Sequence, residues 1–169
     1  GASSVLFSFA NAFLFRQLPG VGTSEVLRVF TSNARGTLYG SCSYADYEDL
    51  RDRTTVFSEL LTYSRAKATL AEHGQSTMIA GALVSANYFA GLGLRPSLGR
   101  FFLPEENRSP GTHPVVVLSD DAWRRRFESD PNVIGRTIGL NGHGFTVVGS
   151  GPPGFAGTSF DEGAEFFLP

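Results

Sequence analysis

The sequence predicts a mixed α/β fold rather than a helical bundle. Of its 169 residues, 20 are glycine and 15 are phenylalanine, and only 18% are charged, a composition typical of sheets joined by tight turns. At 114–127 a buried-strand pattern leads into a capped helix, and Asn141-Gly142 is a strong hairpin signal. With 41% hydrophobic residues, the chain can form one sizeable domain or two small lobes that share a core.

The first fifteen residues, GASSVLFSFANAFLF, are uncharged and are followed by Arg16. They are too few to span a bilayer, which needs about 20 residues. Three interpretations are open: the outer end of a transmembrane helix, a buried helix that starts the domain, and the remnant of a signal peptide whose basic region is missing. We expect residues 1–18 to be the end of a transmembrane helix.

Residues 19–60 predict a strand at 25–30 and then a helix. Ser43 has the features of an N-cap, with Asp46 at the capping-box position, and Tyr47 belongs to the stripe that this helix would bury. The acidic residues predict a solvated helix face rather than a cation site, because arginines lie among them. These acidic residues are Asp46, Glu48, Asp49 and Asp52.

Two strands are predicted at 59–70 and 76–84, joined by a turn at His73-Gly74. Small residues fill much of both strands, which indicates that another part of the chain packs closely on them. These residues are Ala66, Ala68, Ala80, Gly81 and Ala82.

The glycine-rich stretch SANYFAGLGLRPSLGRFF at 85–102 raises the question of a phosphate loop. Ser85 is predicted to cap a short helix at 86–90, and Gly91 and Gly93 fall where this helix ends. A phosphate loop needs its glycines before a helix, so that the backbone amides face the anion. Here the glycines follow the helix, so the stretch predicts turns rather than a nucleotide site.

A buried strand is predicted at 114–118, with Ser119 capping a helix that runs to about Phe127. Trp123 and Phe127 share one face of this helix and are expected to enter the core. Carboxylates in the first turn can pair with arginines four residues later: Asp120 with Arg124 and Asp121 with Arg125. The arginine triplet at 124–126 is expected to be solvated helix surface.

A two-residue turn at Asn141-Gly142 is predicted to join a strand at 136–140 to the next strand. This turn places Leu140 opposite His143, Ile138 opposite Phe145 and Thr137 opposite Thr146. One face is then apolar and the other carries threonine and glycine. The apolar run at 165–169 predicts the start of a further strand.

No catalytic, cofactor-binding or metal-binding residue is predicted. Three histidines, His73, His113 and His143, lie in separate turns without metal-ligand spacing, and Cys42 is the only cysteine. Ser119-Asp120 invites interpretation as a nucleophile, but helix capping accounts for both residues. The net charge of −2 gives no electrostatic case for nucleic-acid binding.

Several stretches together resemble the MacB-type periplasmic core domain of ATP-binding-cassette (ABC) transporter permeases, in particular the large permeases typical of acidobacteria. They are YADYEDLRDRTTVFSEL (44–60), VSANYFAGLGLRPSLGRFF (84–102), PVVVLSDDAWRRRF (114–127) and VIGRTIGLNGHGFTVVG (133–149). NAFLFRQLP (11–19) is similar to the end of the first transmembrane helix in that family.

The resemblance implies a non-enzymatic domain anchored in the bacterial inner membrane and facing the periplasm. Such a domain contacts partner subunits or substrates and relays ATP-driven motion in export or efflux. The implied partners are a cytoplasmic ABC ATPase, a second permease half and a periplasmic adaptor, and no cofactor is implied.

The implied fold has two small α/β lobes with mixed or antiparallel sheets and short helices. The first lobe, porter-like, would span 19–102. The second would span 103–169 and stop before the segment that returns to the first lobe.

Two other classes of protein stay open. One is a stand-alone extracytoplasmic binding or sensor module, which a full gene without transmembrane segments would distinguish. The other is a hydrolase of unrecognised type, which would need a polar cleft holding a nucleophile and a nearby base.

Overall fold

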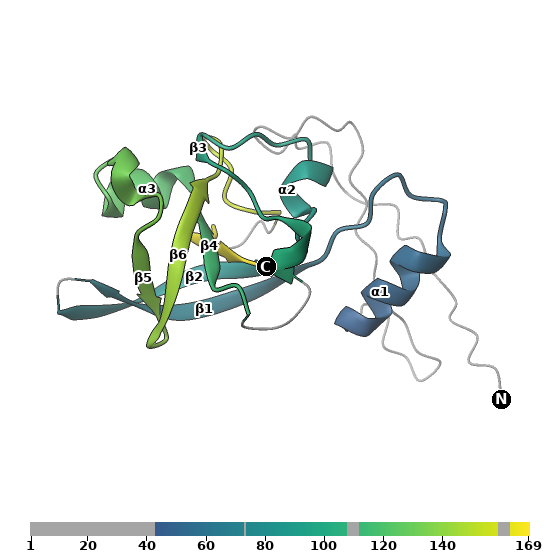
Figure 1. Cartoon of the computed structure of the whole chain (residues 1–169), viewed down its shortest axis with the longest axis horizontal. Helices are drawn as coiled ribbons and strands as arrows, with labels where there is room; N and C mark the ends of the chain where they lie inside the picture. Colours follow the sequence, from purple (N-terminus) through teal and green to yellow (C-terminus); the bar gives the residue numbers. More distant parts are fainter. Residues whose placement is uncertain (1–42, 73, 108–111, 159–162) are drawn as a thin grey trace. The chain divides into compact units, whose positions relative to one another are not determined.

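The structure is a computed structural model that describes residues 43–72, 74–107, 112–158 and 163–169 (Figure 1). The described residues belong to two compact units, 43–60 and 61–169. The expected transmembrane segment at 1–18 and the expected strand at 25–30 lie outside the described residues, as do Cys42 and His73. The mixed α/β class is confirmed.

The unit at 43–60 contains the helix α1 (Tyr44–Arg53). Its capping box is confirmed: the Asp46 amide donates to Ser43 Oγ over 3.2 Å, and the Ser43 amide donates to Asp46 Oδ2 over 3.0 Å. These hydrogen bonds with Ser43 hold the pKa of Asp46 below its ordinary value. Tyr47 is buried, and its hydroxyl donates to the Leu60 carbonyl.

The unit at 61–169 contains a mixed sheet whose strands close into a barrel. Six strands pair in a ring in the order β1-β2-β7-β4-β6-β5 and back to β1. They are β1 (Tyr63–Glu72), β2 (Gln75–Val84), β4 (Val115–Leu118), β5 (Thr137–Leu140), β6 (His143–Ser150) and β7 (Phe166–Leu168). A seventh strand, β3 (Leu98–Gly99), pairs in antiparallel orientation with the last two residues of β6. The ring closes between β1 and β5 through only two residue pairs, Leu70 with Leu140 and Ala71 with Gly139.

Alternation of side chains along these strands produces two cores. One core fills the barrel and includes Leu70, Val116, Val147 and Phe166, with Phe127 among its buried members. The other lies on the opposite faces of β2, β7 and β4, and includes Phe167. Because both faces of β4 are covered, all four of its residues are buried.

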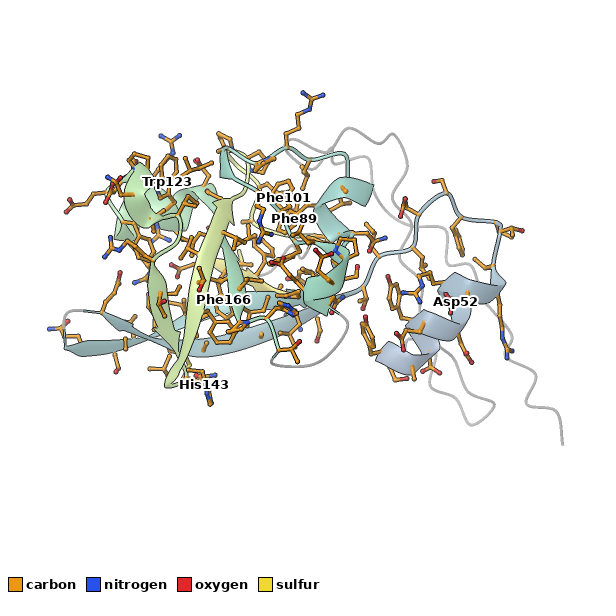
Figure 2. All side chains as sticks on the ribbon, in the orientation of Figure 1. Asp52, Phe89, Phe101, Trp123, His143 and Phe166 are labelled. Atoms are coloured by element: carbon orange, nitrogen blue, oxygen red, sulfur yellow. The ribbon has the colours of Figure 1, made fainter. Side chains whose placement is uncertain are left out.

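The second core is dominated by aromatic rings from α2 (Tyr88–Gly91) and from the segments around Phe101 and Phe155. The rings of Phe89 and Phe101 stack with their centroids 4.2 Å apart, and Figure 2 shows the two side chains next to each other. The ring of Phe167 meets Phe89 edge-on at 5.1 Å. These contacts attach α2 and the chain after it to the outside of the barrel.

The expected lobe boundary between residues 102 and 103 passes through this sheet. Strands before it pair directly with strands after it: β1 with β5, β2 with β7 and β3 with β6. The compact units instead divide between Leu60 and Leu61. Strand pairing therefore continues across the boundary that was inferred from the resemblance.

The β1–β2 hairpin has the predicted turn position, but β1 begins at Tyr63 rather than at residue 59 and runs to Glu72. The predicted capping role of Ser85 is wrong. Ser85 Oγ accepts a hydrogen bond from the Thr62 amide, so it ties β1 to β2 instead of capping a helix. The helix α2 starts later, after Asn87, and has no side-chain cap.

The β5–β6 hairpin has the predicted register, with Leu140 opposite His143 and Ile138 opposite Phe145. Asn141 and Gly142 both have positive φ, at 51° and 79°, as a type I′ turn requires. The strand at the end of the chain is also confirmed as β7, which lies between β2 and β4.

Helix α3 (Asp120–Arg126) follows β4 directly. Ser119 is its N-cap, with its Oγ accepting from the Ala122 amide over 3.1 Å, and both predicted carboxylate–arginine pairs form. The indole Nε1 of Trp123 donates to the Asp130 carbonyl over 2.9 Å. The helix is thereby attached at both ends, and Phe127 reaches the barrel core as predicted.

Candidate interaction surface

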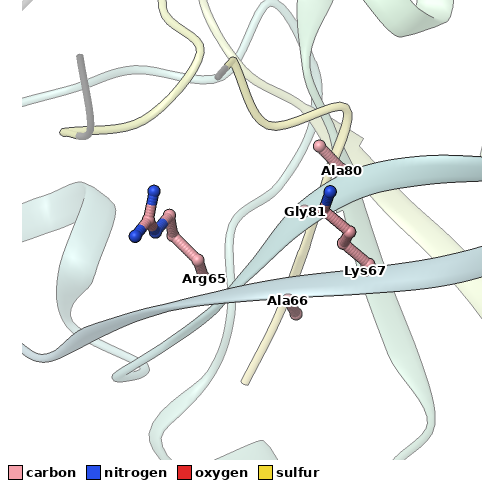
Figure 3. A pocket seen from close by; sticks show the side chains of 5 residues that line it. All are labelled: Arg65, Ala66, Lys67, Ala80 and Gly81. Carbon is pink, nitrogen blue, oxygen red and sulfur yellow. The ribbon is translucent and has the colours of Figure 1, made fainter. Parts of the chain in front are cut away.

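The outer face of the β1–β2 hairpin carries a shallow hollow of about 380 Å³. It is lined by Arg65, Ala66, Lys67, Ala80 and Gly81 (Figure 3). The hollow lies entirely within the unit at 61–169.

The pleat of β1 explains the composition of this hollow. Arg65 and Lys67 are two residues apart on one strand, so their side chains point to the same side, whereas Ala66 points to the other (Figure 3). Their cross-strand partners on β2 are Ala82 and Ala80. Ala82 is buried in the second core, but Ala80 is short and only partly buried, so the space above Ala80 stays open beside Lys67.

This arrangement places two cationic side chains next to each other, where they can contact an anionic group. Its described lining residues include no carboxylate and no histidine. The facing strand β2 carries no charged residue at all. The hollow is thus a candidate surface for contact with carboxylates of another protein.

The sequence motif Ser119-Asp120 has a structural role in α3. Ser119 caps the helix, and Asp120 Oδ2 accepts from Arg124 Nε over 2.6 Å. Asp120 Oδ1 is buried and has no hydrogen-bond partner among the described residues. Of the two described histidines, His113 contacts Thr112 and His143 lies at the β5–β6 turn.

The glycines of 91–99 end a helix and form turns, as the sequence predicts. Gly91 ends α2, and Gly93 has φ +68° just after it. Gly99 has φ +66°, and a Cβ there would clash with the carbonyl oxygen of Val148. These positions require glycine for conformation and close approach.

Among the described residues, no group of three histidine, cysteine or carboxylate side chains could hold a metal ion.

The family model described as "MacB-like periplasmic core domain" matches residues 1–169. The chain belongs to this family. It is accordingly a MacB-like periplasmic core domain, a component of ABC-type transporters. No curated protein matches the chain in sequence.

Solved structures share the fold of this MacB-like domain. The periplasmic region of MacB from Actinobacillus actinomycetemcomitans is 20% identical, with a TM-score of 0.59 over 74% of this chain and 53% of that one. The extracellular domain of the noncanonic ABC-type transporter YknZ from Gram-positive bacteria is 16% identical, with a TM-score of 0.60 over 76% of this chain and 62% of that one. The MacB-like domain thus spans between half and two thirds of these solved domains.

Two ion pairs shape the surface of the MacB-like domain. Arg100 donates to both carboxylate oxygens of Glu106, over 3.0 and 2.7 Å, and the Leu103 amide adds a bond of 2.8 Å. The hydrogen bond from Arg100 is the main reason that the pKa of the buried Glu106 lies below its ordinary value. This pair holds the turn that leads into the short 3₁₀ helix at Pro104–Asn107.

The second pair corrects the expectation for the arginine triplet. Arg124 and Arg125 are exposed, but the side chain of Arg126 is only 19% exposed and binds Glu165 through two hydrogen bonds of 2.5 and 3.2 Å. Glu165 also uses its backbone, donating to the Ala80 carbonyl and accepting from the Ser119 amide. Sequence reasoning missed this site because the two partners are 39 residues apart.

Within the part of the chain that the structure describes, helices are too short or too polar to cross a bilayer.

Proposed function

We propose that this chain is the extracytoplasmic part of an ABC transporter permease that sits in a bacterial inner membrane and faces the periplasm. The observation that supports this proposal is the family match along residues 1–169. In the proposed role the domain is not an enzyme. It contacts partner subunits or substrates and relays motion that a cytoplasmic ABC ATPase drives through the permease.

The basic hollow is the surface that we propose for a partner contact. Arg65 and Lys67 stand roughly 7 Å apart along the strand, from a rise of about 3.3 Å per residue. Two carboxylates four residues apart on a partner helix have a spacing of about 6 Å, since each residue rises 1.5 Å. A periplasmic adaptor or a second permease half that presents such a pair would match the hollow in charge and spacing.

The orientation of the domain can be tested by labelling the full-length protein in cells. Cys42 is the only cysteine among these 169 residues, so Cys42→Ser, together with replacement of any cysteine elsewhere in the full-length protein, gives a thiol-free background. In that background Ser76→Cys places a thiol on the exposed part of β2. A membrane-impermeant maleimide should label it in cells whose outer membrane has been permeabilised.

Val116→Cys is the matched control, because Val116 is 0% exposed and should react only after denaturation. Labelling of Ser76→Cys only after cell lysis would contradict the periplasmic orientation. Release of the labelled protein by osmotic shock, without membranes, would instead support a stand-alone extracytoplasmic module.

The partner contact is tested separately by reversing charge in the hollow. Arg65→Glu with Lys67→Glu should change ATP hydrolysis by the purified transporter complex several-fold, because the relay would be disturbed at the contact. The control variant Arg95→Glu with Arg136→Glu reverses two exposed cations elsewhere. Equal responses of the two variants would show that the hollow has no special role.

A further inference from the structure

The β5–β6 turn combines two features that the transport role does not use. Asn141 is the only one of the six asparagines in the chain that is followed by glycine. Glycine has no side chain to hinder attack of its backbone nitrogen on the carbonyl carbon of the preceding asparagine side chain. The sequence Asn-Gly is therefore the one at which asparagine loses its amide most readily.

The turn is also open to solvent. Asn141 and Gly142 are both exposed, and no atom outside the neighbouring residues comes within 4 Å of where a Cβ of Gly142 would lie. Water can therefore reach the turn.

One restraint opposes the reaction in the folded protein. The Asn141 amide donates to the Thr69 carbonyl over 2.9 Å, and Asn141 Oδ1 accepts from the Thr69 amide over 2.8 Å. These bonds continue the short β1–β5 ladder, which otherwise pairs only Leu70 with Leu140 and Ala71 with Gly139. We call this junction, from Thr69–Ala71 to Gly139–Asn141, the barrel seam. It directs the side-chain carbonyl of Asn141 toward β1.

We propose that Asn141 is a site of spontaneous deamidation whose rate in the folded protein is set by opening of the barrel seam. The nitrogen of Gly142 forms a bond to Cγ of Asn141, the Cγ–Nδ2 bond breaks, and Nδ2 leaves as ammonia with the proton from the Gly142 amide. Water then opens the resulting succinimide at either carbonyl and gives aspartate or isoaspartate. No oxidant or cofactor takes part.

The two products affect the barrel differently. Aspartate keeps an oxygen that can accept from the Thr69 amide, so it leaves the seam in place. Isoaspartate adds one carbon to the main chain between positions 141 and 142. That extra carbon is incompatible with the two-residue turn that pairs Leu140 with His143. Its formation should weaken the closure between β1 and β5.

The test follows deamidation of the full chain in mildly alkaline buffer by peptide mass spectrometry, with and without denaturing urea. We expect Asn141 to be modified before the other asparagines, and at least about tenfold more slowly in the folded chain than in urea, since the seam must open first. Isoaspartate should form, and chains that contain it should show faster hydrogen exchange at the Thr69 amide.

Two buried leucines separate seam opening from global unfolding. Leu140→Ala removes packing at the seam, whereas Leu92→Ala removes a leucine of equal burial from the other core. The first variant should accelerate deamidation of the folded chain more than the second, and both should react alike in urea. Equal acceleration would refute gating by the seam. Earlier reaction at another asparagine, no reaction in the folded chain, or the same rate folded and in urea would each refute the proposal.

Discussion

The ring of Phe166 lies directly against the backbone of Gly81, inside the barrel. A Cβ atom on Gly81 would clash with three carbons of that ring. The parallel pairing of β2 with β7 places these two residues side by side, with Gly81 opposite Phe166. Gly81, one of the small residues of β1 and β2, thus has the close neighbour that the sequence predicted.

Gly81→Ala should therefore destabilise the protein by about 1–3 kcal/mol through overpacking. Gly139→Ala is the control, because its Cβ would lie 3.5 Å from that of Ala71, an ordinary contact. Urea unfolding of both variants measures the difference. If Gly81→Ala is as stable as the wild type, the ring does not pack on Gly81 as described.

Glu106→Gln should lower the free energy of unfolding by about 1–3 kcal/mol at neutral pH, because it leaves Arg100 without its charged partner. The guanidinium of Arg100 is half-exposed, so we expect a value at the lower end of this range. The pKa of Glu106 is lowered in the folded state, so its contribution exists above the ordinary glutamate pKa of about 4.3 and is lost as the pH falls through the lower, folded-state value. The stability gap between wild type and variant should accordingly close in acid. A gap that persists well below pH 4 or is absent at pH 7 would contradict the pair's role.

Arg126→Ala should destabilise the domain by about 1–3 kcal/mol, because it breaks the partly buried pair that connects α3 with the residue before β7. The adjacent Arg125 is 55% exposed, and its closest carboxylate, that of Asp121, is 68% exposed. Arg125→Ala should therefore cost no more than about 0.5 kcal/mol, and that effect should vanish in high salt. An equal loss of unfolding free energy in the two variants would mean that burial does not strengthen the ion pair of Arg126.

Glu128→Gly should stabilise the protein by about 0.5–1 kcal/mol. Glu128 has φ +52° just after α3, a conformation that costs residues with a side chain more than glycine. The reverse experiment is Gly135→Ala, where φ is +84° and no atom lies within 4 Å of the added Cβ. It should destabilise by about 1 kcal/mol through backbone conformation alone. Thermal melting should show a higher melting temperature for Glu128→Gly and a lower one for Gly135→Ala. A loss of stability in Glu128→Gly would show that the positive φ of Glu128 does not strain the backbone.

The sequence alone determined the local elements of this domain and its family. The capping box of Ser43 and Asp46, the cap of Ser119 and the register of the Asn141-Gly142 hairpin all follow from residues close together in the sequence. Such signals act before any tertiary contact forms, because they satisfy backbone groups within one or two turns of chain. Four stretches of the chain then sufficed for the resemblance that the family match confirms.

Tertiary structure alone decided the strand order, the closure of the barrel and the partners of several polar side chains. Ser85 bonds across 23 residues to Thr62 instead of capping the adjacent helix, and Asn141 bonds across 72 residues to Thr69. Arg126 finds Glu165 only because β7 enters between β2 and β4, next to α3. Periodicity and turn residues report which face of a segment is buried, but not which distant segment covers it. That choice depends on packing between segments that meet only in the folded chain.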